Sequence, residues 1–229
     1  MSEEKKDLEL EENETTQGEP LPEDPSGEPE EDASEENKKE SSSLESNLYT
    51  WAQALVIAVV GVVLLFTFGV RLISVSGPSM QDTLYTGDQL LVLSAMFCDF
   101  KAGDVVVIND YNAEPQLNET LVKRIVAVGG QKVDIDFFNG VVYVDDAALD
   151  EPYIKEPTYQ PEGVEFPLVL AEDEVFVMGD NRNHSSDSRD SRLGPVKTGY
   201  LQGKALFLLT PGATPDTEKR DWGRVGLIR

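Results

Sequence analysis

The chain has 229 residues, of which 43 are Asp or Glu and 19 are Lys or Arg, so its formal net charge is -24. A chain this acidic repels the phosphate backbone of nucleic acids, and we expect no nucleic-acid partner. Cys98 is the only cysteine and His184 the only histidine, which excludes an intrachain disulfide and argues against a structural zinc site.

Residues 1–46 are rich in Glu, Ser, Pro and Lys and contain almost no large apolar side chains. Such a segment buries too little apolar surface to offset the entropy lost when its backbone is ordered. We therefore predict that residues 1–46 form a disordered acidic tail.

The 20 residues from Trp51 to Val70 carry no charge. A helix of this length spans about 30 Å, the thickness of the hydrocarbon core of a bilayer. A cleaved signal peptide is a poorer interpretation, because the apolar run is too long and about fifty residues precede it. We predict one transmembrane helix over residues 51–72, in the cell membrane. Lys38 and Lys39 favour a cytoplasmic tail and an extracytoplasmic domain after the helix.

Residues 73–229 are predicted to form one mostly β domain, because short runs of β-branched residues are bounded by Gly and Asp. Asn139-Gly140 predicts a β-hairpin with a two-residue turn. A smaller β insertion is expected at roughly residues 130–175 and includes an irregular excursion, residues 145–167, which contains four prolines. The expected strands are residues 89–94, 104–108, 120–128, 133–137, 141–144, 174–178 and 201–209.

Ser79 is the candidate nucleophile. It follows Gly77-Pro78, which predicts a tight turn because Gly tolerates unusual φ values and Pro fixes its own. The turn exposes the hydroxyl of Ser79, but a serine is unreactive until a base accepts its proton.

Lys123 is one candidate for that base. A lysine buried among apolar neighbours loses its proton several pH units below its reference pKa of about 10.4 and can then act as a general base. Spacing alone leaves open an edge-strand lysine with its amine in water. Strand alternation predicts two faces, one with Leu121, Lys123, Ile125 and Ala127 and the other with Val122, Arg124, Val126 and Val128.

His184 is the rival base, with Asp180 or Asp187 as its partner in a Ser-His-Asp arrangement. Its loop is dense in turn formers and short polar residues, which also fits a solvated surface histidine.

The same loop offers an ion pair. Asp187 and Arg189 can brace a site through charge-assisted hydrogen bonds, with Arg124 as a second cation. Asp190-Ser-Arg192 repeats Asp187-Ser-Arg189, so the sequence leaves the register of this pairing open.

Several stretches, in one order behind a single apolar span, resemble the bacterial type I signal peptidases, which are membrane-anchored Ser/Lys leader peptidases. The resemblance covers nearly all of residues 51–210 but not the acidic tail, and it is to the branch found in Gram-positive bacteria. The matching stretches are Ser79-Met80 with Thr83-Leu84, residues 103–107 (GDVVV), residues 123–129 (KRIVAVG), the Asn139-Gly140 hairpin, residues 179–182 (GDNR) with Ser185 and Asp187-Ser-Arg189, residues 194–196 (GPV) and residues 203–205 (GKA).

The resemblance implies a serine endopeptidase with Ser79 as nucleophile and Lys123 as general base. Ser185 would orient the lysine amine, and Asp187, Arg124 and Arg189 would form a supporting ion-pair network. The family fold is a β-rich catalytic core with a smaller β insertion. Its substrates are secreted preproteins, cut after small residues in an Ala-X-Ala pattern by an enzyme expected to be monomeric and to need no metal or cofactor. The residues implied to line shallow substrate pockets are Val75, Ser76, Gly77, Met80, Leu84, Leu121 and Val122.

Two positions depart from the family pattern. Asp82 stands where many relatives have proline, which bears on the rigidity of the loop and not on the chemistry. Gly77 stands where some relatives have a serine that stabilises the oxyanion, so backbone N–H groups, including that of Ser79, would take this role. Two other functions stay open: a peptidase of the same clan dedicated to a narrow substrate such as a pilin, and an inert membrane-tethered domain that binds peptides.

Overall fold

The computed structural model describes residues 32–109, 120–215 and 218–228. By its internal contacts the chain divides into two units, Met1–Ala54 and Leu55–Arg229. The tail predicted over residues 1–46 falls in the first unit, and its residues 1–31 lie outside the described part of the chain. The backbone of residues 32–46 is helical, whereas we expected no regular structure there; Glu and Lys, which are frequent in this stretch, are good helix formers.

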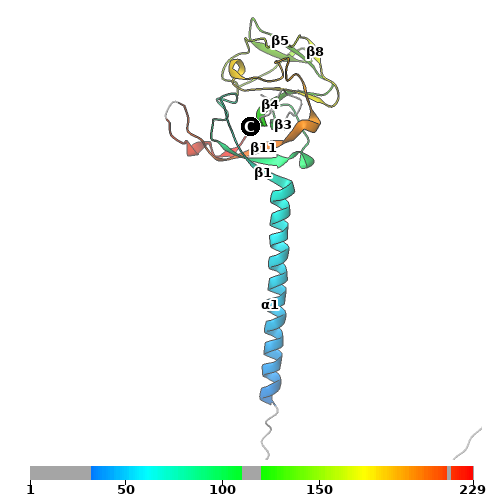
Figure 1. Cartoon of the computed structure of the whole chain (residues 1–229), viewed down its shortest axis with the longest axis vertical. Helices are drawn as coiled ribbons and strands as arrows, with labels where there is room; N and C mark the ends of the chain where they lie inside the picture. Colours follow the sequence, from blue (N-terminus) through cyan, green and yellow to red (C-terminus); the bar gives the residue numbers. More distant parts are fainter. Residues whose placement is uncertain (1–31, 110–119, 216–217, 229) are drawn as a thin grey trace, which may run out of the picture. The chain divides into compact units, whose positions relative to one another are not determined.

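The apolar segment lies in helix α1 (Asp32–Leu64), which continues into a π-helical turn, η1 (Leu65–Gly69) (Figure 1). The stretch Asn47–Gly69 has a mean hydropathy of 2.4 and is long enough to cross a membrane. Its large apolar side chains, including Phe66, are exposed, as expected for a helix that faces lipid. The helix ends before the predicted limit at residue 72, because the chain is already strand β1 from Val70.

The larger sheet has eight antiparallel strands within the described residues, in the order β1-β2-β11-β3-β4-β9-β10, and β12 pairs with β11. β1 is at one edge, whereas β3 and β4 lie inside the sheet (Figure 1). The strand bounds are β1 (Val70–Ser74), β2 (Gln89–Ser94), β3 (Val105–Asn109), β4 (Thr120–Val128), β9 (Glu174–Met178), β10 (Val196–Lys197), β11 (Leu201–Thr210) and β12 (Gly226–Leu227).

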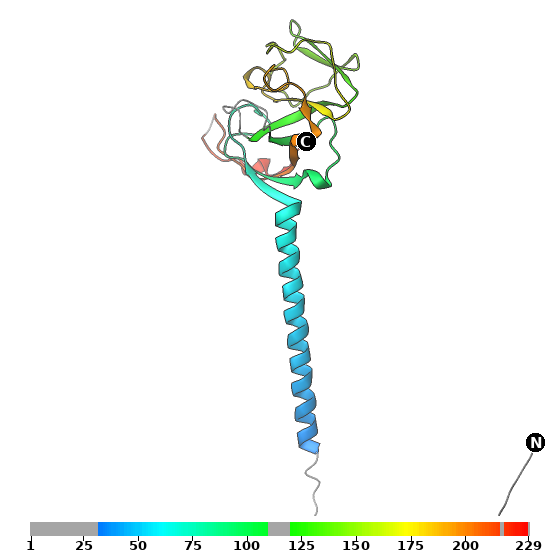
Figure 2. The same cartoon turned by 45° about the vertical axis from the view of Figure 1, so that its right-hand side comes forward.

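A smaller sheet, formed between β4 and β9 in the chain, has the strand order β7-β6-β5-β8. Its strands are β5 (Lys132–Asp136), β6 (Val141–Val144), β7 (Ala147–Ala148) and β8 (Leu168–Val169). Figures 1 and 2 show it at the end of the β domain away from β1. Short 3-10 helices complete the described part: η2 (Ala95–Phe97), η3 (Arg182–His184), η4 (Thr198–Tyr200) and η5 (Trp222–Arg224). The predicted mostly β fold is confirmed.

The predicted hairpin at Asn139-Gly140 joins β5 and β6, but its loop is longer than predicted. Asp136 pairs with Val141, so four residues, Phe137 to Gly140, connect the strands. The Asp136 carboxylate accepts hydrogen bonds from the backbone N–H groups of Phe138 and Asn139. This local side-chain bonding stabilises the longer loop, and Gly140 provides the left-handed residue with a φ of 74°.

The predicted alternation along β4 holds only up to Ile125. A bulge between Ile125 and Ala127 shifts the register of β4 against β9. Leu121, Ile125 and Val128 consequently pack in one apolar cluster, whereas Ala127 packs in another. The predicted assignment of Ala127 and Val128 is wrong, because an extra residue in one strand reverses every following side chain.

Candidate active site

Ser79 lies in the turn that connects β1 to β2, on top of buried apolar residues. Gly77 has a φ of 86°, the left-handed conformation expected of the predicted turn. Met80 and Leu84 are each 1% exposed, and the Leu84 N–H donates to the Met80 carbonyl (2.7 Å). Ser79 itself is half-buried. The two anchored side chains therefore fix the turn while Ser79 stays accessible.

Lys123 lies on β4 and is 2% exposed. Its Nζ atom donates a hydrogen bond to Ser185 Oγ (3.0 Å), and Ser185 Oγ donates to Asp187 Oδ2 (2.8 Å). Burial lowers the pKa of Lys123 to about 8, although the negative charge of Asp187 acts against this shift. The structure therefore places Lys123 inside the domain and not at an edge with its amine in water.

Gly179 separates the turn of Ser79 from the partner of Lys123. A Cβ atom at Gly179 would lie 2.4 Å from the Ser79 carbonyl oxygen and 2.3 Å from Ser185 Oγ. The Asn181 backbone N–H donates to the Ser79 carbonyl (3.0 Å), and the Asn181 side chain donates to the Pro78 carbonyl (3.1 Å). The loop that follows β9 thus holds the serine turn and the hydrogen-bond partner of the lysine side by side.

Asp187 and Arg189 form an ion pair whose two side chains are both fully buried. Arg189 Nε donates to Asp187 Oδ1 (2.8 Å), and the Gly179 N–H donates to Asp187 Oδ2 (2.9 Å). By contrast, the Asp190–Arg192 pair lies at the surface, where the Arg192 side chain is 61% exposed. In the structure Asp187 therefore pairs with Arg189 and Asp190 with Arg192, a choice that the repeated sequence left open.

Arg124 does not join the Asp187–Arg189 pair, so the predicted network is wrong at this residue. Its guanidinium donates to both carboxylate oxygens of Asp180, at 2.9 and 2.7 Å. Thr83 Oγ1 donates to the same carboxylate (2.5 Å). Arg124 projects from the face of β4 opposite to Lys123, and it therefore braces the turn after Ser79 through Asp180 and Thr83.

Arg182 is a buried cation for which no role was predicted. Its Nε atom donates to the Gly179 carbonyl (3.0 Å), and its terminal nitrogens donate to Glu151 (2.5 and 3.0 Å) and to Thr158 (3.0 Å). It connects the loop after β9 to the irregular excursion. The sequence carries no local signal of this pairing, because 31 residues separate Arg182 from Glu151.

The His184 side chain lies at the surface, although its neighbour Ser185 belongs to this hydrogen-bonded chain. Its side chain is 68% exposed and lies 3.4 Å from Glu156. The carboxylates of Asp180 and Asp187, its predicted partners, bind Arg124 and Arg189 instead. The geometry therefore gives no Ser-His-Asp arrangement among the described residues. These residues also contain no group of three or more His, Cys, Asp or Glu side chains that could hold a metal ion.

The residues expected to line substrate pockets divide between two sides of the sheet. Leu121 packs in a different apolar cluster from the others. Gly77 is half-buried and Ser76 is exposed. Val75, Met80, Leu84 and Val122 all belong to the cluster beneath the Ser79 turn.

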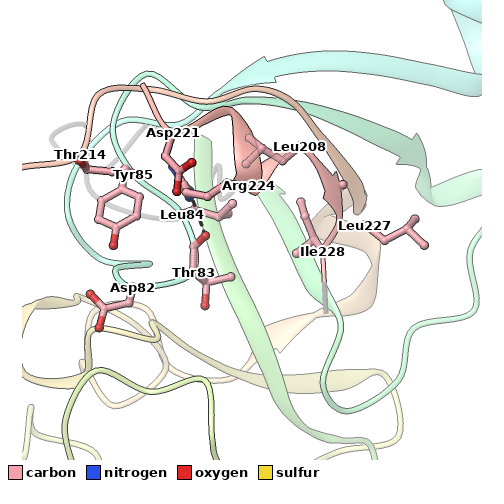
Figure 3. A pocket seen from close by; sticks show the side chains of 11 residues that line it. Asp82, Thr83, Leu84, Tyr85, Leu208, Thr214, Asp221, Arg224, Leu227 and Ile228 are labelled. Carbon is pink, nitrogen blue, oxygen red and sulfur yellow. Dashed lines mark hydrogen bonds between the residues drawn. The ribbon is translucent and has the colours of Figure 1, made fainter. Parts of the chain in front are cut away.

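A pocket of about 360 Å³ lies beside the same turn, next to the C-terminal segment (Figure 3). Arg224 lines it and forms an ion pair with the fully buried Asp88 (2.5 Å). Arg224 also donates to the Thr83 carbonyl (3.2 Å) and stacks on the Tyr85 ring, 4.4 Å from its centroid. This contact was not predicted, since a lone arginine near the C-terminus carries no local sign of its partner.

Comparisons with known proteins find one family. The model of the family described as "Signal peptidase, peptidase S26" matches residues 48–210. The chain is 33% identical to signal peptidase I of Bacillus amyloliquefaciens, over 76% of this chain and 95% of the relative. It is 31% identical to signal peptidase I S of Bacillus subtilis, with the same coverage. A crystal structure of a signal peptidase I from Enterococcus faecalis is 25% identical with a TM-score of 0.38, over 47% of this chain and 97% of that one.

Proposed function

The chain belongs to the signal peptidase family of S26 serine peptidases, and from this premise we propose that Ser79 is the nucleophile and Lys123 the general base with which it removes signal peptides from secreted preproteins. The observation that carries this proposal is the buried Lys123 amine, bound to Ser185 directly across Gly179 from Ser79. A buried amine with a pKa of about 8 is neutral in a useful fraction of molecules near neutral pH.

The hydrogen bonds around Lys123 suit a base. The amine donates a hydrogen bond to Ser185 Oγ, and the Ser185 hydroxyl donates a hydrogen bond to Asp187. This fixes the amine and leaves its lone pair free to accept a proton from the Ser79 hydroxyl. The alkoxide oxygen then attacks the scissile carbonyl, and the Lys123 ammonium returns the proton to the leaving amine. Lys123 finally activates a water molecule that hydrolyses the acyl-enzyme.

The substrate is proposed to bind as an extended strand beside residues 74–77. β1 is an edge strand of the larger sheet within the described residues, and an edge strand can pair with an added peptide. After β1, the Val75 N–H donates to the Asp88 carbonyl and the Val75 carbonyl accepts from the Gly87 N–H, so both groups of Val75 are paired with the chain before β2. Small substrate side chains would contact the turn that covers Val75, Met80, Leu84 and Val122, beside Ser76 and Gly77, whereas Leu121 packs in a different apolar cluster. The backbone N–H of Ser79 would stabilise the oxyanion.

The apolar helix is proposed to anchor the enzyme as a monomer in the cell membrane. A single pass with the acidic tail of residues 1–46 in the cytoplasm places the domain of residues 73–229 outside the cell. There the catalytic site lies near the bilayer, where the apolar part of a signal peptide resides. The insertion at roughly residues 130–175 would belong to this extracytoplasmic domain.

The experiment that tests the proposal is preprotein cleavage by single variants in detergent or lipid vesicles. Ser79→Ala and Lys123→Ala are each expected to abolish cleavage, whereas His184→Ala retains it. Cleavage by Lys123→Ala together with its loss in His184→Ala would move the role of base to the histidine.

A further inference from the structure

The irregular excursion before β8 reaches the catalytic loop through its backbone. The Ser191 N–H donates to the Glu162 carbonyl (3.1 Å), and the Val164 N–H donates to the Arg189 carbonyl (3.1 Å). Arg189 also donates from its side chain to the Gln160 carbonyl (3.2 Å). Residues 160–164 therefore lie against the loop that contains Ser185 and Asp187.

Glu162 directs its carboxylate toward this loop. Its Oε1 atom is 3.9 Å from a terminal nitrogen of Arg189, and its side chain is 21% exposed. Its Oε2 atom is buried and has no hydrogen-bond partner within the described residues. A buried carboxylate oxygen without a donor is costly to retain, and burial raises the pKa of Glu162 accordingly. Such a group calls for a functional explanation.

A continuous set of contacts leads from Glu162 to the catalytic lysine. Arg189 contacts Glu162 on one side and binds Asp187 on the other. Asp187 accepts a hydrogen bond from Ser185, and Ser185 accepts one from Lys123. The positive charge of Arg189 disfavours a second positive charge on Lys123. The Glu162 carboxylate offsets part of the Arg189 charge.

Other charged groups face the same two side chains. Glu162 is influenced by Arg189, Asp187 and Asp190, and Lys123 is influenced by Asp187, Arg189, Glu162 and Asp180. Of the acids that face Lys123, Asp187 binds Arg189 directly and Asp180 binds Arg124. Glu162 lies 3.9 Å from Arg189 and is also stabilised by the backbone N–H of Asp187, so its carboxylate is held less tightly than those of Asp187 and Asp180.

We propose that Glu162 is a positioning residue of the active site, which holds Arg189 against Asp187 and helps to keep Lys123 protonated. Glu162 thereby sets the pH range in which the enzyme works. This inference rests on the proposed role of Lys123 as base. Loss of the Glu162 charge leaves the Arg189 charge less compensated and makes the Lys123 ammonium less stable. The neutral, active amine is then formed at a lower pH.

The test is the pH dependence of kcat/KM for a signal-peptide substrate in wild type, Glu162→Gln and Glu162→Asp. In Glu162→Gln the acid limb of the profile should move to lower pH by a few tenths of a unit up to about one unit, so that kcat/KM near pH 6.5 rises about two- to tenfold. Glu162→Asp keeps the charge and should keep the wild-type limb. Glu165→Gln is the matched control, since this exposed acid lies in the same segment and should change nothing.

The outcomes separate this inference from the proposed function. A merely structural role for Glu162 would lower the unfolding temperature and kcat at every pH without moving the limb, and that result would overturn the inference. If the acid limb of the wild-type profile lies near pH 8 and does not move in Glu162→Gln, the role of Glu162 is overturned but the proposed function is not. A flat wild-type profile, with activity retained in Lys123→Ala, would overturn the proposed function as well. If Glu162→Gln does not fold, Glu162→Met should shift the limb in the same direction.

Discussion

The Lys123 amine donates a hydrogen bond to Ser185 Oγ at 3.0 Å, and 62 residues separate these two side chains in the sequence. The Ser185 hydroxyl donates a hydrogen bond to Asp187, so its oxygen is oriented to accept one from the lysine. This contact fixes the position of the buried amine.

Ser185→Ala removes the acceptor that orients the Lys123 amine. We expect kcat to fall about 10- to 100-fold with little change in KM, because a displacement of a reacting group by about 1 Å can cost about 10²-fold in rate. Steady-state cleavage kinetics measure both constants. Ser186→Ala is the control, since Ser186 donates to Asp190 beside the site, and equal losses in the two variants would contradict the orienting role.

Gly179→Ala places a methyl group between the two halves of the site. Its Cβ atom would lie within 2.4 Å of the Ser79 carbonyl oxygen and of Ser185 Oγ, so at least one of them must move. A displacement of about 1 Å in an active site can cost about 10²-fold in rate, and we expect at least that loss in kcat/KM. Gly199→Ala is the control, because nothing lies within 4 Å of a Cβ atom there. A fully active Gly179→Ala enzyme would contradict the close approach.

Asp180→Asn leaves the guanidinium of Arg124 without its counter-charge in a position that is 1% exposed. Removal of one partner of a buried ion pair costs about 3–5 kcal/mol, and the free energy of unfolding measured in urea should fall by this amount. Asp146→Asn breaks an exposed pair with Lys132 and should cost less than about 1 kcal/mol. Similar losses in both variants would refute the special role of the buried pair.

Arg224→Ala should impair the enzyme although residue 224 lies beyond the stretch matched by the family model, residues 48–210. The change leaves the buried Asp88 carboxylate without its cation and removes a donor to the Thr83 carbonyl. We expect about 3 kcal/mol less stability and a lower kcat, because Thr83 belongs to the turn after Ser79. Arg220→Ala, at an exposed position in the same segment, should have no effect. An intact kcat in Arg224→Ala would show that the C-terminal segment does not support the turn.

The local parts of the fold were predictable from the sequence. β2, β4, β6 and β9 have the predicted bounds, because runs of β-branched residues between Gly and Asp determine them. The bulge after Ile125 was not predictable, since it depends on the pairing of β4 with β9. The early end of the helix was not predictable for the same reason, because the residues from Val70 onward form strand β1 by pairing with β2.

The resemblance implied individual residues of the site but not how they pair. The resemblance pointed to Ser79, Lys123 and Ser185, and the structure brings the last two into contact. It could not assign Arg124 to Asp180, because charges of one sign are interchangeable in a sequence. Glu162 carried no motif at all. Its relation to Arg189 exists only because the excursion folds back onto the loop.

The rate at which an acylating serine inhibitor labels Ser79, followed by mass spectrometry at several pH values, tests the central claim most directly. In the wild-type enzyme the rate should rise about tenfold per pH unit below the pKa of Lys123, near 8, and then level off. In Lys123→Met, which fills the same space without an amine, labelling should be slower by about 10³-fold or more and lose that pH dependence. Labelling of Lys123→Met at the wild-type rate, with the same rise toward pH 8, would contradict the account.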